Sequence, residues 1–90
     1  MSDFKFPLGR VVATPNAMLA VSMPEFISAI KRHRCGDWGD VDEHDRQENE
    51  LSLQRWLRLL SVYHTRAGVT CWIITEADRS VTTLLLPEDY

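Results

Sequence analysis

The spacing of apolar residues along the chain changes at about residue 59. Upstream, Phe26, Ile27 and Ile30 recur at the three- to four-residue spacing of one helix face. Downstream, three segments rich in β-branched, aromatic and leucine residues are separated by short polar loops. The pattern therefore predicts helices in the first part of the chain and strands in the last third.

A helical region is predicted after a short N-terminal strand over residues 9–14. It begins at Thr14-Pro15, because a proline suits the first helical turn, where its missing N–H would be unpaired anyway. It restarts at Ser22, where Ser-Met-Pro-Glu has the spacing of a capping box. Gly36 is expected to end it.

A second helix is predicted from about Asp42 to Leu57. Acidic residues fill its first turn, where they complement the positive end of the helix dipole. Its predicted apolar face consists of Leu53, Trp56, Leu57 and Leu60, and Asn49 falls on the same stripe.

The last third of the chain predicts a meander of three strands. Their expected bounds are Leu59–Thr65, Val69–Glu76 and Val81–Leu86. The connecting segments, 66–68 and 77–80, have the length of hairpin loops, and Pro87 ends the ladder. These elements predict an α+β fold of order β-α-α-β-β-β, with two helices packed on one face of a small antiparallel β-sheet.

Length and composition indicate a single domain over residues 1–90. Of these residues 44% are hydrophobic and 26% charged, which is too apolar for an intrinsically disordered chain. Folding at this length buries about 64% of the extended-chain surface, enough for one modest core. No apolar run approaches the roughly 20 residues of a membrane-spanning helix, and the first residues do not resemble a signal peptide. We therefore expect a cytoplasmic protein with no membrane partner.

The charge balance disfavours nucleic acid as a partner. Ten Lys and Arg residues face thirteen Asp and Glu, giving a net charge of −3 and a pI near 5.5, whereas phosphate-binding proteins usually carry a basic excess. The basic cluster at 31–34 is expected to form the last turn of a helix, with an anion contact as the alternative. Cys35 and Cys71 are too few for a thiolate metal site, and no metal or cofactor is predicted.

The final hairpin collects the polar side chains of most chemical interest. They are Glu76, Asp78, Arg79, Ser80 and Thr82. Two carboxylates and a guanidinium at this spacing could orient a phosphate or activate a water molecule. In the alternative interpretation, Asp78 and Ser80 cap the turn through the backbone, and Arg79 and Glu76 form a solvated ion pair.

Trp38 and Asn49 are two further candidates for binding. Trp38 lies in a turn between the two predicted helices, where it would cover the core or contact a partner. Asn49 lies on an apolar stripe, so its amide needs hydrogen-bond partners. Either the turn at 37–39 supplies them, or the side chain is available to a ligand.

Several segments resemble one family. They are WIITEADRSVTTLLLPEDY at 72–90, GDWG at 36–39, ENE at 48–50 and LSVY at 60–63. Over residues 9–90 the chain resembles small proteins encoded on bacterial plasmids, phages and other mobile elements, often labelled plasmid-related proteins. The resemblance implies a bacterial, cytosolic, mobile-element setting and brings no activity with it.

These observations favour a non-enzymatic protein–protein interaction module, in which no residue is assigned a catalytic role. The partner is expected to be another protein or a second copy of the chain, because so short a chain has difficulty covering its apolar faces, and a homodimer would cover them. The alternative is a toxin-like or antirestriction-like protein that acts on nucleic acid through the hairpin from Glu76 to Arg79.

Overall fold

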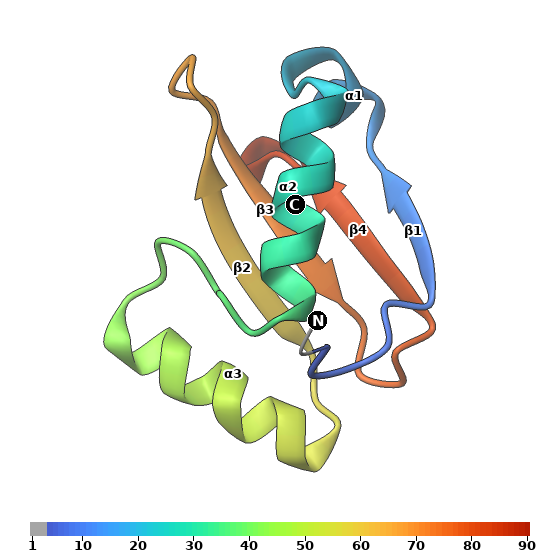
Figure 1. The fold of residues 1–90 in the computed structure, drawn as a ribbon, viewed down its shortest axis with the longest axis vertical. Helices are drawn as coiled ribbons and strands as arrows, with labels where there is room; N and C mark the ends of the chain where they lie inside the picture. The colour runs from blue at the N-terminus through green and yellow to red at the C-terminus, as the bar shows by residue number, and fades with distance from the viewer. Residues whose placement is uncertain (1–3) are drawn as a thin grey trace.

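The computed structural model, which describes residues 4–90, has a small α+β fold (Figure 1). A four-stranded sheet is formed by β1 (Arg10–Ala13), β2 (Leu59–His64), β3 (Thr70–Thr75) and β4 (Val81–Leu85). The helices are α1 (Pro15–Ala20), α2 (Met23–Arg34), α3 (Glu43–Arg55) and the short 3-10 helix η1 (Pro87–Asp89). The predicted α+β fold class is confirmed. The first predicted helical region consists of two helices, α1 and α2, and η1 is an addition.

The three C-terminal strands form the predicted meander, but the sheet is not wholly antiparallel. The strand order is β1-β4-β3-β2, and β1 runs parallel to β4, with Arg10 opposite Val81. Only β2–β3 and β3–β4 are antiparallel. The sheet is therefore mixed, because β1 joins the free edge of β4 rather than extending the meander.

Each main helix begins at the residue that the sequence predicts. Thr14 Oγ1 accepts a hydrogen bond from the Ala17 amide and caps α1. Ser22 caps α2, and Asp42 caps α3 by accepting from the Asp45 amide at 2.8 Å. The basic cluster does fall in the last turn of α2.

The predicted apolar face of the second helix is wrong at its C-terminal end. Helix α3 stops at Arg55, because Trp56 adopts the left-handed conformation with φ of 56°. The Trp56 and Leu57 side chains are consequently half exposed, at 56% and 47%. Leu60 belongs to β2. Of the four apolar residues of the predicted stripe, only Leu53 lies on α3 and packs against a core cluster, the one that contains Trp38.

The main core lies between the sheet and the helices α1 and α2. Its buried residues are Ala17, Val21, Ala29, Tyr63, Cys71, Ile73, Leu84 and Leu86. A second cluster, formed by Phe6, Trp38 and Leu59, lies toward α3. None of the helices in residues 4–90 is long and apolar enough to cross a membrane.

Candidate functional site

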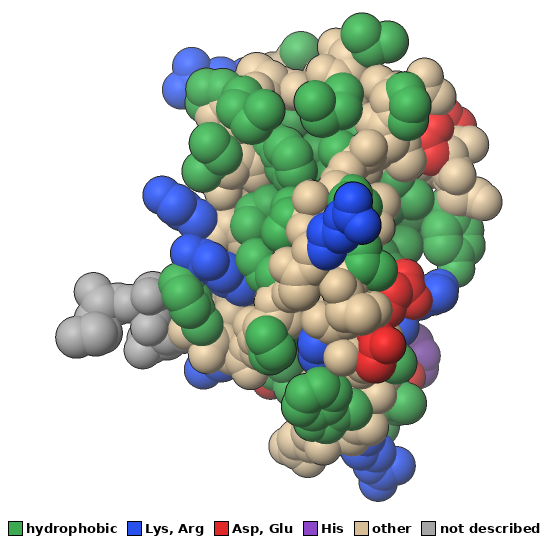
Figure 2. Space-filling model, turned by 90° about the vertical axis from the view of Figure 1, so that its right-hand side faces the viewer, with side chains coloured by type: hydrophobic (Ala, Val, Ile, Leu, Met, Phe, Trp, Pro, Cys, Tyr) green, Lys and Arg blue, Asp and Glu red, His purple; other side chains and the backbone are tan. Residues whose placement is uncertain are grey.

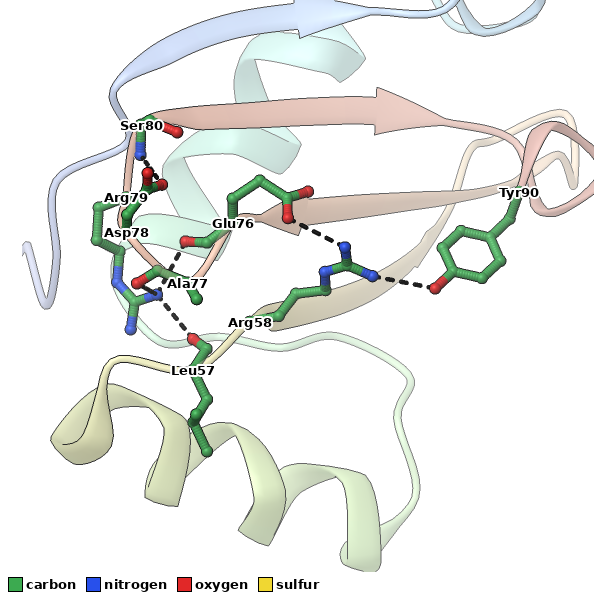
Figure 3. A network of polar contacts seen from close by, with 8 residues as sticks. All are labelled: Leu57, Arg58, Glu76, Ala77, Asp78, Arg79, Ser80 and Tyr90. Atoms are coloured by element: carbon green, nitrogen blue, oxygen red, sulfur yellow. Dashed lines mark hydrogen bonds and ion pairs between the residues drawn. The ribbon is translucent and has the colours of Figure 1, made fainter.

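Arg79, the cation of the predicted hairpin site, points into the protein (Figure 3). Its backbone is left-handed, with φ of 62°, and the residue is only 5% exposed. The guanidinium donates to the carbonyl oxygens of Leu57 at 2.7 Å and Ser52 at 2.9 Å, at the C-terminal end of α3. It also donates to the carbonyls of Glu76 and Ala77. Arg79 therefore ties the β3–β4 hairpin to the end of α3.

The other polar side chains of the hairpin point in different directions. The Glu76 carboxylate pairs with Arg58 at 3.0 Å, and the Arg58 guanidinium also reaches the Tyr90 hydroxyl (Figure 3). The Asp78 carboxylate accepts from the amide of Ser80 at 3.0 Å, and hydrogen bonds to Ser80 lower the pKa of Asp78. The hairpin residues are therefore close in sequence and in the fold, but the Glu76 and Asp78 carboxylates and the Arg79 guanidinium do not contact one another.

Thr82 follows that turn in β4, and its side chain lies on the core side of the sheet. Its side chain is fully buried, and its hydroxyl donates to the Leu8 carbonyl at 2.7 Å. Ser80, in contrast, is exposed. The expected ion pair between Arg79 and Glu76 is replaced by a bond from the guanidinium to the Glu76 backbone, so the capping interpretation describes Asp78 but not Arg79.

Trp38 covers the core, as one of the two interpretations of the sequence expected. It is 4% exposed, stacks on Phe6 with ring centroids 6.1 Å apart, and donates its indole N–H to Glu50 at 2.8 Å. Asn49, which precedes Glu50 in α3, is also buried. It does not form the expected hydrogen bond to the turn at 37–39 and bonds to Leu60.

Asn49 instead closes the outer edge of β2. Its amide donates to the Leu60 carbonyl at 2.7 Å, and its carbonyl accepts from the Leu60 amide at 3.0 Å. Two residues along, Val62 exchanges backbone hydrogen bonds with Trp38 and Asp40. An unpaired strand edge is a template for association with other chains. The Asn49 side chain and the 38–40 segment therefore occupy much of the outer edge of β2.

We expect Asn49→Ala to lower the free energy of unfolding by about 2 kcal/mol, because both Leu60 backbone groups would lose their partner at a partly buried site. Urea unfolding monitored by circular dichroism measures this. The control is Gln54→Ala on the exposed side of α3, with an expected change within about 0.5 kcal/mol. Equal effects of the two substitutions would contradict the assigned role of Asn49.

A buried histidine, His33, is the polar residue that sequence reasoning missed. It is fully buried, with Nδ1 2.6 Å from Ser61 Oγ and Nε2 2.8 Å from Thr75 Oγ1. Thr75 Oγ1 in turn lies 2.7 Å from Thr82 Oγ1. The sequence carries a weak signal for it, since His33 follows Phe26 by seven residues and Ile30 by three, which places it on the same helix face.

The direction of these hydrogen bonds follows from counting protons. The single hydroxyl proton of Thr82 goes to the Leu8 carbonyl, so Thr75 must donate to Thr82. Thr75 Oγ1 is then an acceptor for His33 Nε2–H, which leaves Nδ1 to accept from Ser61. The network therefore places a proton on Nε2, and burial, which lowers the pKa of His33 to about 3, keeps the ring neutral with Nδ1 as the acceptor. These hydrogen bonds link α2 to β2, β3 and β4.

The surface between α2 and β1 carries the feature that the sequence did not predict. A groove of about 270 Å³ runs there. Its apolar lining consists of Val11, Met23, Phe26, Ile27 and Ile30. Figure 2, which faces the β1 side of the molecule, shows hydrophobic side chains gathered over this region with Lys and Arg side chains along its margin. We call this feature the α2–β1 groove.

One end of the α2–β1 groove is basic. Lys31 and Arg34 line it, and no carboxylate of residues 4–90 pairs with either. The Arg34 guanidinium lies over the Phe4 ring, 3.6 Å from its centroid. Arg34 Nε is the one buried side-chain polar atom in the described part of the chain that lacks a hydrogen-bond partner. The groove therefore combines an apolar floor with a positioned cation.

Within residues 4–90, no three His, Cys, Asp or Glu side chains gather into a group that could hold a metal ion. Comparison of the chain with protein-family models, curated proteins and solved structures found no match.

Proposed function

We propose that the chain is a non-enzymatic protein–protein interaction module that binds its partner at the α2–β1 groove. The observation that carries the proposal is the exposed apolar surface on this side of the molecule. The exposed apolar side chains of β1, α1 and α2 are Val11, Met18, Leu19, Met23 and Ile27. Contiguous apolar surface of this kind marks interaction sites, because leaving it in water is unfavourable.

The fold itself gives little reason for these residues to be apolar. Leu19 is 87% exposed, and Met23 and Ile27 are about half exposed on a helix whose opposite side already packs on the core. Methionine adapts its shape to different contacts, which suits a binding surface. A partner that covered Met23, Ile27 and Val11 would bury this area from water.

The β3–β4 hairpin supports a protein partner over nucleic acid, and the family resemblance supports the cellular setting. The hairpin groups that would serve a nucleic-acid-acting protein are engaged elsewhere: Arg79 on carbonyl oxygens and Glu76 on Arg58. The resemblance to plasmid- and phage-encoded proteins supports a role in a bacterial mobile element and a cytoplasmic location. The acidic net charge of −3 is a further argument for a protein partner over nucleic acid.

A photocrosslinking amino acid at Ile27 tests this proposal in bacteria that carry the gene. We expect a discrete crosslinked product from Ile27 and none from the same amino acid at Gln54, which is exposed on α3. A product of twice the chain mass would identify self-association, which light scattering of the purified protein would then confirm. Absence of a product at Ile27, or equal products at both positions, would contradict the proposed surface.

Polar substitutions in the groove should impair binding without impairing folding. We expect Met23→Gln and Ile27→Gln each to change the free energy of unfolding by less than about 1 kcal/mol, because both side chains are half exposed. The yield of the crosslinked product, measured with the crosslinker at Val11, should fall strongly in both variants. A large loss of stability would instead assign these side chains to the core.

A further inference from the structure

We propose that the partner contributes an extended, acidic segment that adds to β1 as a fifth strand and lays its apolar side chains in the α2–β1 groove. This inference rests on the proposed function, since it names the kind of partner that the groove takes. It follows from three observations: the open edge of β1, the position of the groove beside that edge, and the charge at the end of the groove.

The two edges of the sheet differ. The Arg10 amide donates to the Ser80 carbonyl and the Thr14 amide to the Leu84 carbonyl, so alternate residues of β1 face β4. The backbone groups of Val11 and Ala13 therefore point away from the sheet. Within residues 4–90, no hydrogen bond from another segment reaches them. At the opposite edge, Asn49 and the 38–40 segment bond to β2.

The groove lies where the side chains of an added strand would fall. Val11 lines the groove, so α2 lies over the same face of the sheet toward which this residue points. A new strand would lie about 4.8 Å beyond β1, with every second side chain on that face. Those side chains would meet Met23 and Ile27, which α2 presents half exposed. Backbone pairing and apolar burial would then act together, as in other cases of strand addition.

The charge at the groove selects an acidic segment. Lys31 and Arg34 close one end, and no acidic residue lines the groove. Stacking on Phe4 holds the Arg34 guanidinium in place, so a carboxylate would find a preorganised donor. A second copy that paired β1 with β1 would bring Arg10 and the same two cations to this edge. Charge complementarity therefore favours an acidic partner over self-pairing.

Synthetic peptides test the proposal directly. The probe is an acetylated, amidated heptapeptide with valine and threonine alternating in its centre and glutamate at both ends. Its matched control has lysine at both ends. We expect the glutamate peptide to bind at least about tenfold more tightly by isothermal titration, and to shift the Val11 and Ala13 amide signals in NMR spectra. The double variant Lys31→Glu, Arg34→Glu should reverse the preference, whereas Arg66→Glu, which is exposed elsewhere, should leave it unchanged.

Backbone pairing is tested separately from charge. Val11→Pro removes one outward-facing N–H and leaves the bonds from Arg10 and Thr14 to β4 in place, so it should weaken binding about tenfold or more. Two N-methylated forms of the glutamate peptide test backbone pairing on the unaltered protein. One form is methylated at the odd-numbered residues of the peptide and the other at the even-numbered residues, so that only one form loses the N–H groups that would face β1. We expect one form to lose binding and the other to keep it.

The outcomes separate the two proposals. Equal affinity for the glutamate and lysine peptides, equal affinity for both N-methylated forms, or no peptide binding at all would each overturn the fifth-strand proposal. A dimer that Val11→Pro dissociates, without peptide binding, would overturn it in favour of a second copy. In all these cases a crosslinked product at Ile27 would still support the groove as an interaction surface, and its absence would remove that proposal as well.

Discussion

Replacing Arg79 with alanine is expected to lower the free energy of unfolding by about 3 kcal/mol or more. The guanidinium is buried and donates to four carbonyl oxygens, two of which lie at the end of α3. A helix C-terminus attracts a cation, and the Ser52 carbonyl, which is buried, and the three partly buried carbonyls are costly to leave without a charged donor. Urea unfolding at neutral pH measures the loss, and the end of α3 should lose amide-exchange protection first.

Two further substitutions separate the guanidinium from the backbone conformation of Arg79. Arg79→Gly loses the same hydrogen bonds but suits φ of 62°, so it should be about 1 kcal/mol more stable than Arg79→Ala. Arg79→Lys should recover little, because an ammonium group cannot span four carbonyls as a planar fork does. Arg66→Ala, at an exposed position, serves as the control with almost no change. An Arg79→Ala protein within about 1 kcal/mol of the unaltered chain would contradict this role.

The direction of the Arg79 side chain illustrates what the sequence could not predict about the candidate site. The turn at 77–80 lies where the sequence predicts it, and Asp78 caps the turn as one interpretation expected. Whether the guanidinium meets the carboxylates depends on the left-handed backbone at Arg79 and on carbonyls of Ser52 and Leu57, which are more than twenty residues away in sequence. Local pattern carries no information about such distant acceptors.

The fold was more predictable than the site, because strands and caps are local. Content of β-branched, aromatic and leucine residues and hairpin length placed β2, β3 and β4, and Thr14, Ser22 and Asp42 marked the helix starts. The apolar spacing continues past Arg55, so it could not show that Trp56 stops α3. Likewise, the parallel direction of β1 leaves no trace in its alternation, since parallel and antiparallel strands share the same period.

The α2–β1 groove was missed for a related reason. The helical spacing of Phe26, Ile27 and Ile30 predicts one apolar face, but it does not show how wide the core contact of that face is. In the structure, Phe26 and Ile30 pack partly against the core while Ile27 remains half exposed. The stripe is therefore wider than the sheet covers, and its uncovered part is the surface that we assign to a partner.

His33 should make the protein lose stability in mild acid. Burial, with a smaller effect of the Arg79 charge, lowers the pKa of His33 from 6.5 to about 3. Below pH 6.5 the unfolded chain therefore binds a proton at His33, whereas the folded chain does not. The contribution of neutral His33 to the free energy of unfolding is complete above pH 6.5 and is lost progressively down to about pH 3. Between pH 7 and pH 5 we expect a loss of about 2 kcal/mol in the free energy of unfolding.

That interval separates the histidine from the carboxylates, most of whose protonation occurs nearer pH 4. Urea unfolding at pH 7, 6 and 5 measures the slope, which the control His44→Gln, at an exposed position, should retain and His33→Gln should lose. If His33→Gln does not fold, NMR of the unaltered protein decides the matter. The His33 ring should stay in the Nε2–H form, with Nδ1 as acceptor, from pH 8 down to pH 5. A His33 ring that titrates near pH 6.5 in the folded protein would contradict both the buried network and the predicted loss of stability.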